Sequence, residues 1–81
     1  MRARVRRYCY ALSASETKSC FKSELMEWHR RGSNTPTAVR IYANYYDMSI
    51  RDLYSRLGPG TFDNVADQYA KEIAPKIRQS L

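Results

Sequence analysis

The sequence predicts an all-α protein, a small four-helix domain with a basic N-terminal arm, within 81 residues. Two observations support this. Apolar side chains recur three and four positions apart over four separate stretches, the spacing that places them on one face of a helix. Between these stretches stand Ser, Thr, Gly and Pro, the residues that begin and end helices. We therefore expect helices at residues 14–31, 36–46, 49–57 and 61–74, followed by a short tail.

The first two helices have recognisable ends. Ser13 and Glu16 fit a capping box at the start of the first helix, and Gly32 follows its last turn. Thr35 is the expected cap of the second helix, with Pro36 in the first helical position, where its fixed φ is favourable.

The last two helices begin in a similar way. Ser49 with Asp52 resembles a capping box, and Thr61 is the expected cap of the fourth helix. Pro75 should break or kink that helix, because it lacks an N–H group and its ring clashes with the preceding turn. The spacing of Ile77 and Leu81 predicts that one more turn resumes afterwards.

The predicted core combines the apolar faces of all four helices, with the first and fourth covering the apolar sides of the central pair. It consists of Phe21, Leu25, Trp28, Val39, Tyr42, Ala43, Leu53, Leu57, Val65, Tyr69 and Ile73.

Composition favours a folded protein with a polyanionic partner. Hydrophobic residues make up 43% of the chain, too many for a disordered one. The net charge of +6 on so small a domain favours nucleic acid as the partner, although an uninvolved basic surface would have the same composition. We divide the chain into an arm, residues 1–12, and a helical DNA-binding domain, residues 13–81.

The cysteines and the N-terminus argue against several classes of protein. Cys9, Cys20 and His29 are too few to make a zinc site, so we expect no metal and no cofactor. A disulfide is conceivable, but we favour buried free thiols. The basic N-terminus lacks the apolar run of a signal peptide, and no stretch has the ~18 apolar residues of a membrane span. We expect a cytoplasmic protein.

The central stretch, residues 35–58, carries the most information. Two short helices joined by about three residues have the plan of a helix-turn-helix. Ala43, Ser49 and Leu53 match positions that this family keeps small, polar and aliphatic, whereas Asp47 stands where the family prefers Gly and Arg56 where it prefers an aliphatic residue. The chain thus resembles helix-turn-helix DNA-binding proteins over about a quarter of its length. The resemblance implies that helix 49–57 enters a DNA major groove.

Candidate contact residues follow from this arrangement. Arg51 is placed to bond guanine O6 and N7, and Arg40 to bind phosphate. Asp52 and Arg56 are four residues apart, so they could instead pair with each other, and a solvated helix face is the plain alternative for any single arginine. The base-reading set is Ser49, Arg51, Asp52 and Ser55, and the phosphate-binding set is Arg2, Arg4, Arg6, Arg7, Arg40 and Arg56.

The N-terminal arginines admit three interpretations. We favour a flexible arm that follows phosphates or enters the minor groove. The alternation of Arg2, Arg4 and Arg6 with apolar residues would also suit a strand paired with another subunit, and a disordered tail is the third possibility.

We therefore expect a sequence-specific double-stranded DNA-binding protein, and no enzyme. It would be a transcription regulator or an architectural recombination factor of phage or plasmid type. It would be a homodimer through the C-terminal helix and tail, with Ile73, Ile77 and Leu81 in the contact. One alternative is a protein-interaction module that inhibits or docks on a larger enzyme or nucleic-acid machine through exposed Tyr and Trp. Another is a single-strand or RNA binder that uses the N-terminal Arg and Tyr residues.

Overall fold

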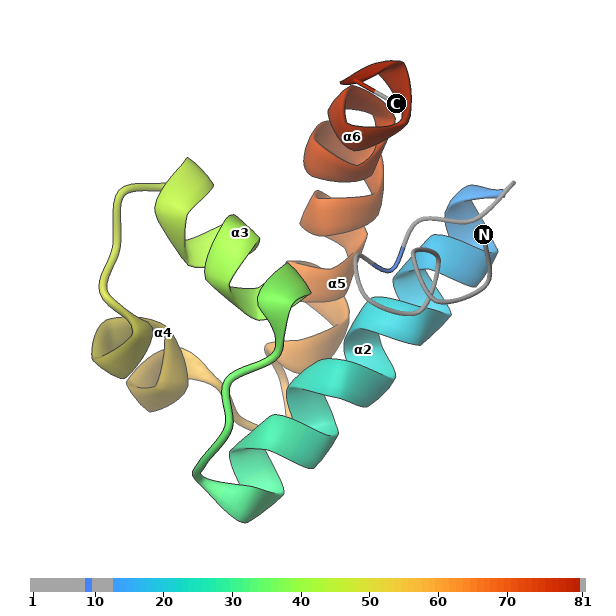
Figure 1. Ribbon diagram of the computed structural model, residues 1–81. Coiled ribbons are helices and arrows are strands. Elements are labelled where there is room, and N and C mark those ends of the chain that lie inside the picture. Colours follow the sequence, from blue (N-terminus) through green and yellow to red (C-terminus); the bar gives the residue numbers. More distant parts are fainter. Residues whose placement is uncertain (1–8, 10–12, 81) are drawn as a thin grey trace.

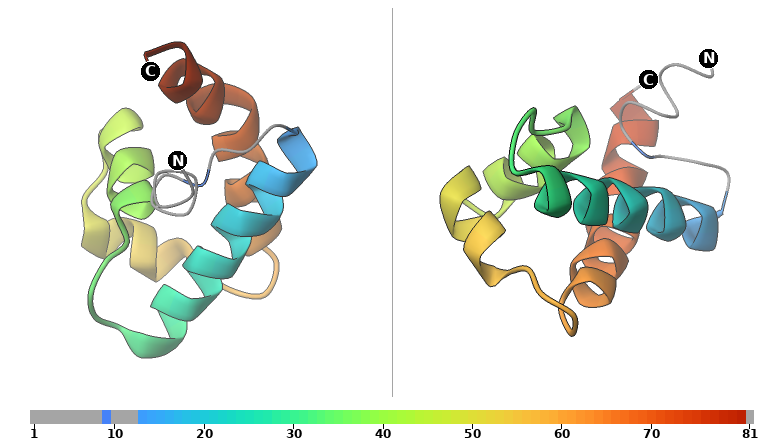
Figure 2. Two further views of the ribbon diagram at one scale, coloured as in Figure 1. Left: turned by 45° about the vertical axis from the view of Figure 1, so that its right-hand side comes forward. Right: turned by 90° about the horizontal axis from the view of Figure 1, so that it is seen from below.

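The computed structural model describes residue 9 and residues 13–80, all of whose regular elements are helical. Helix α2 (Ala14–Arg31) crosses a long C-terminal helix made of α5 (Phe62–Gln68), the π-helical segment η1 (Tyr69–Ile73) and α6 (Ala74–Ser80) (Figure 1). The shorter α3 (Thr37–Tyr45) and α4 (Ile50–Arg56) lie to one side of this crossing (Figure 2). The all-α prediction is confirmed for this part of the chain.

Helix α2 begins and ends as predicted. The Glu16 N–H donates to Ser13 Oγ at 3.1 Å, and the Ser13 hydroxyl donates to Glu16 Oε1 at 2.8 Å. At the other end Gly32 adopts a left-handed φ of 77°, and its N–H donates to the Trp28 carbonyl at 2.8 Å. A residue with a side chain would be strained at this φ, so glycine ends the helix here.

Helices α3 and α4 are separated by a turn at the predicted place. Asp47 has a φ of 53°, and the Met48 N–H reaches back to the Ala43 carbonyl at 2.9 Å while the Asp47 N–H bonds the Asn44 carbonyl at 3.2 Å. This pair of bonds is a Schellman motif, which ends a helix sharply. The Ser49 cap of α4 is confirmed by a 3.0 Å bond from the Asp52 N–H to Ser49 Oγ.

Two predicted threonine caps are wrong. The N-cap of α3 is Pro36, and no side chain within residues 13–80 caps the helix, so Thr35 does not serve this role. Thr61 stands at the N-cap of α5 but makes no capping bond. Its Oγ1 instead accepts from the Gly58 N–H at 2.7 Å and lies 3.1 Å from the Arg56 and Gly58 carbonyl oxygens, so it closes the loop before α5.

Pro75 does not break the C-terminal helix, which corrects that part of the prediction, whereas the predicted further turn through Ile77 is confirmed by α6. The helix continues to Ser80, and its hydrogen bonding widens over Tyr69–Ile73, where the Ala74 N–H bonds the Tyr69 carbonyl five residues back. A π-turn is one of the ways in which a helix accommodates an interruption. The wider turn directly before Pro75 gives the proline ring the room that a regular α-turn denies it.

The core is centred on the contact between α2 and the C-terminal helix rather than on the α3–α4 pair, which corrects the expected packing. Phe21 and Tyr69 stack across it with ring centroids 4.0 Å apart. Ten of the eleven predicted core residues are buried, and Val65 is half-exposed. The prediction missed several small buried residues that let the helices approach closely: Thr17, Ala38, Ala66, Ala70 and Ala74.

Cys9 and Cys20 form a disulfide, so the prediction of free thiols is wrong. Their Cα atoms are 5.5 Å apart, and Cys9 is fully buried in the core. The pairing depends on where the chain lies relative to α2, which local spacing does not reveal. Disulfides are typical of oxidising compartments, so this one lends no support to the cytoplasmic prediction. None of the described helices is long and apolar enough to span a bilayer.

Candidate nucleic-acid interface

The predicted base-reading side of α4 faces solvent. Its residues Ser49, Arg51, Asp52, Ser55 and Arg56, which we call the α4 face, are all exposed. On the opposite side Leu53 and Leu57 are buried, with 1% and 5% of their surface exposed. Because both leucines anchor the helix from behind, the α4 face is presented outward and is free to meet a partner.

The two serines of the α4 face are already partly used. Ser49 Oγ accepts the Asp52 N–H, so its own proton is free to be donated. The Ser55 hydroxyl donates to the Arg51 carbonyl at 3.0 Å, so it retains only acceptor capacity. Phosphate offers acceptors only, so Ser49 suits phosphate, and Ser55 suits a donor on a base, such as a cytosine or adenine amino group.

The charged side chains of α4 form no ion pair with any residue of the described part of the chain. Asp52 and Arg56, which could have paired with each other, form no ion pair among the described residues. Arg51 and Arg40 likewise make no ion pair or side-chain hydrogen bond with any described residue. The guanidinium groups of Arg40, Arg51 and Arg56 are therefore available.

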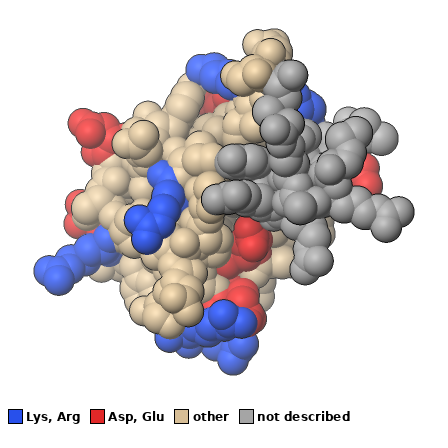
Figure 3. All heavy atoms as spheres, viewed as in Figure 1, with Lys and Arg blue, Asp and Glu red and all other residues tan. Residues whose placement is uncertain are grey.

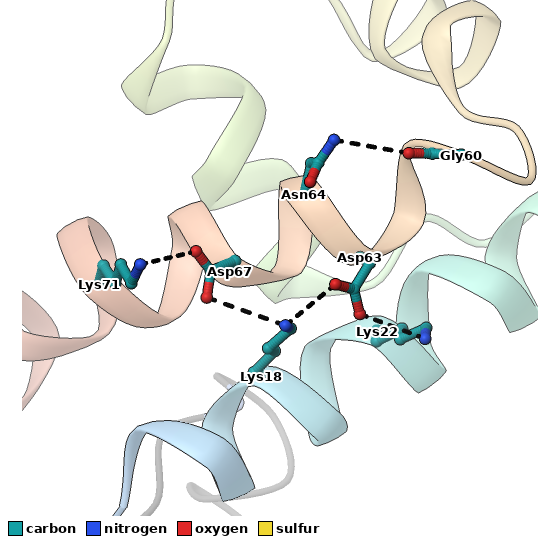
Figure 4. A network of polar contacts seen from close by, with 7 residues as sticks. All are labelled: Lys18, Lys22, Gly60, Asp63, Asn64, Asp67 and Lys71. Carbon is teal, nitrogen blue, oxygen red and sulfur yellow. Dashed lines mark hydrogen bonds and ion pairs between the residues drawn. The ribbon is translucent and has the colours of Figure 1, made fainter.

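The cations of α2 and the C-terminal helix are bound within the protein. Lys18 bridges Asp63 at 3.0 Å and Asp67 at 3.9 Å, and Lys22 reaches Asp63 at 3.4 Å (Figure 4). Glu27 pairs with Arg31 and Asp67 pairs with Lys71, both at 3.0 Å, and Arg30 also bonds Glu27. Lys76 Nζ donates to Tyr45 Oη at 2.7 Å.

Most of the net charge lies outside the helices. Residues 13–80 contain ten of the 14 Lys and Arg residues and all eight acidic residues, a net charge of +2. On the face shown in Figure 3 the basic groups stand apart, with uncharged surface between them. The remaining positive charges belong to Arg2, Arg4, Arg6 and Arg7, which lie outside the described residues, as does Leu81. The choice between an arm, a strand and a disordered tail concerns the same N-terminal residues and stays a prediction.

Two shallow grooves meet at the start of α4. One, of about 430 Å³ between α3 and α4, is bordered by Arg40 and Ser49. The other, of about 400 Å³, is bordered by Arg51 and Ser55, and Ile50 lines both. The two grooves that share Ile50 are thus bordered by Arg40, Ser49, Arg51 and Ser55 from the two predicted sets. Arg56, at the far end of α4, lines neither groove.

Most tyrosines of residues 13–80 serve packing. Tyr42 Oη donates to Gln68 Oε1 at 2.7 Å, and burial raises the pKa of Tyr42. Burial and the nearby Glu72 carboxylate raise the pKa of Tyr46 to about 12, so its hydroxyl stays protonated. Tyr45, 41% exposed, is the largest exposed aromatic group described. Trp28 is only 3% exposed and cannot anchor a protein partner, as the interaction-module alternative supposed.

The residues predicted for the dimer contact differ in burial. Ile73 is 2% exposed and belongs to this chain's own core, so it cannot lie in a dimer contact, whereas Ile77 is half-exposed on α6. The ring of His29 stacks on Tyr54 at 4.6 Å. No cluster of three potential metal ligands occurs among residue 9 and residues 13–80.

Comparison with known proteins assigns no family to the chain. No protein-family model matches it, and no curated protein or solved structure is significantly similar. The resemblance to helix-turn-helix proteins therefore stays a prediction that depends on the residues of the central stretch.

Proposed function

We propose that this protein is a sequence-specific DNA-binding protein that uses α3 and α4 as a helix-turn-helix. Helix α4 would lie in the major groove, with Arg51 on a guanine edge and Ser55 accepting from a neighbouring base. Arg40, Ser49 and Arg56 would contact phosphates on either side. The N-terminal arginines would add contacts that depend on charge alone. The proposed role is a regulator or architectural factor, with no catalysis.

One observation carries this proposal. The three arginines that the described protein leaves without a partner all lie on α3 and α4, while the cations of α2 pair with acidic side chains. A guanidinium group that is exposed and unpaired can bond a base or phosphate without first breaking an internal ion pair. The Schellman turn supports the proposal, since Asp47 adopts the left-handed conformation for which the family favours Gly.

The test is a mobility-shift titration with a duplex selected from a random pool by the parent protein. Arg51→Ala should lower the preference for the selected duplex over random duplex by about fivefold or more, since a bidentate guanine contact is worth ~1–3 kcal/mol. Arg30→Ala is the matched control, because it removes the same charge from an exposed arginine that is already paired to Glu27. If both variants retain the parental preference, α4 does not read DNA.

Salt dependence tests the role of the arm. Replacing Arg2, Arg4, Arg6 and Arg7 with alanine should reduce the slope of log affinity against log salt by about three to four, with little change in the preference between duplexes. An unchanged slope would remove the arm from the interface.

The proposal includes a homodimer, since paired subunits would read two half-sites one helical turn apart. With Ile73 in the core, the partly buried Ile77 on α6, which packs against the edge of that core, is the remaining described candidate for the contact. Sedimentation equilibrium of the parent and of Ile77→Asp tests it, and a parent that is monomeric at micromolar concentration on and off DNA would end it.

A further inference from the structure

Helix α4 meets the end of α2 through the aromatic side chain of Tyr54. The Tyr54 ring packs edge-on against Trp28 with centroids 5.0 Å apart and stacks on His29 at 4.6 Å. Its hydroxyl donates to the His29 carbonyl oxygen at 2.6 Å. We call this contact between Tyr54 and residues 28–32 the Tyr54 junction.

The end of α2 is shaped to receive Tyr54. The last carbonyls of a helix lack partners within the helix, and the Tyr54 hydroxyl supplies one for His29. Gly32 ends α2 in a left-handed conformation, and a Cβ atom at this position would lie 3.3 Å from Tyr54 Oη. The glycine thus serves both the backbone turn and the close approach of the hydroxyl group.

The junction continues to the start of α5. On its other side the His29 ring makes an edge contact with Phe62, with centroids 5.5 Å apart. One set of rings therefore joins α2, α4 and the first residue of α5. It fixes both the distance and the rotation of α4, because a stacked ring and a hydrogen bond constrain different directions.

Helix α4 needs such a constraint. It has only seven residues, and a helix of that length is not stable in isolation. Leu53 and Leu57 hold it from behind, but apolar contacts specify direction weakly. Arg51 lies one turn before Tyr54 and Ser55 directly follows it, and all three border the groove that also contains Trp28 and Gly32. A rotation of α4 about its contact at Tyr54 would therefore displace the side chains of both Arg51 and Ser55.

We propose that Tyr54 is a positioning residue that sets the orientation of α4 and thereby the sequence preference of Arg51 and Ser55. This inference rests on the proposed function, in which α4 reads the bases. The Tyr54 hydroxyl donates its proton to the His29 carbonyl oxygen, so it contributes no phosphate contact and no salt dependence. Its loss should lower discrimination between duplexes while leaving sequence-independent affinity unchanged.

Tyr54→Phe tests this without removing the ring. Backbone amides of α4, among them the Leu53 N–H that bonds the Ser49 carbonyl, should exchange with solvent about three- to tenfold faster, while the amides of α2 keep their parental rates. The preference for the selected over the random duplex should fall by a similar factor at an unchanged salt slope. The control is Tyr45→Phe, which removes a hydroxyl bonded to Lys76 on the surface of α3.

The outcomes separate this inference from the proposed function. Parental exchange rates in α4 of Tyr54→Phe would overturn the junction as a constraint. Faster exchange with a parental duplex preference, in a series where Arg51→Ala loses that preference, would overturn positioning and leave the proposed function intact. A parental preference in Arg51→Ala as well would overturn both.

Discussion

The contact of α2 with the C-terminal helix and the α3–α4 pair differ in how they use their side chains. In the first region Phe21 stacks on Tyr69, and Lys18 and Lys22 pair with acidic groups of α5. In the second region the helices have nine and seven residues, and their arginines have no described partner. The charged side chains of the first region therefore pair with one another, whereas the arginines of the second region stay available to bind a partner.

This difference suggests a division of roles. Stability resides where large apolar surfaces and ion pairs coincide, and sites that bind a partner are drawn from less strongly held segments. Helix α4 is attached through Leu53, Leu57 and the Tyr54 junction, so its orientation can be disturbed without unfolding the α2 contact. Substitutions in each of the two regions test this division of roles.

The largest effect is expected at the aromatic stack. Phe21→Ala should lower the free energy of unfolding by ~3–5 kcal/mol, because it removes a fully buried ring and leaves a cavity against Tyr69. Urea unfolding followed by circular dichroism measures this. Tyr45→Ala, at the exposed aromatic of α3, should cost ~1 kcal/mol or less. Equal losses in the two variants would contradict the division of roles.

Reduction of the disulfide should come next. The bond joins residues 11 apart in sequence and so should stabilise the fold by about 3 kcal/mol through the restricted unfolded chain. Thermal unfolding with and without dithiothreitol measures the difference, and the double variant Cys9→Ser, Cys20→Ser should be insensitive to the reductant. Identical melting temperatures of the oxidised and reduced parent would show that the bond adds no stability.

The elements that the sequence predicted correctly depend on neighbours within a few residues. The caps at Ser13 and Ser49 and the glycine end at Gly32 each involve a contact three or four positions away, so a short pattern suffices. Thr35 and Thr61 fit the same pattern but do not cap, because the conformation of the preceding loop decides where a hydroxyl points. Local chemistry alone does not determine that conformation.

The other failed predictions, and the contacts that were not predicted, depend on packing beyond the local pattern. The helix continues through Pro75 while Ile73 and Ala74 on its near side are buried, and this packing favours a continuous helix. The disulfide and the Tyr54 junction join segments 11 and 25 residues apart. For the candidate site, periodicity correctly predicted which side of α4 is exposed, but not the ring contacts that orient it.

The smallest effect is expected from the ion pairs of α5, and it has a definite sign. Hydrogen bonds from Lys18 and then Lys22, with the positive charges of both, lower the pKa of Asp63 in the folded protein. A carboxyl whose pKa is depressed by folding contributes stability above its unfolded value, about 4, and that contribution is lost as the pH falls through the folded value. The stability difference between the parent and Asp63→Asn should therefore be present at neutral pH and shrink below about pH 4. Urea midpoints measured across this range test the sign, and added salt should reduce the difference at neutral pH because the pairs are exposed.

Asp47→Asn is the control, since the Asp47 carboxylate is exposed and forms no ion pair with the described residues. The Asp47→Asn variant shows what the loss of an exposed carboxylate charge alone does to the urea midpoint. A difference for Asp63→Asn that stays constant down to about pH 3 would show that the ion pairs of Asp63 with Lys18 and Lys22 do not stabilise the fold.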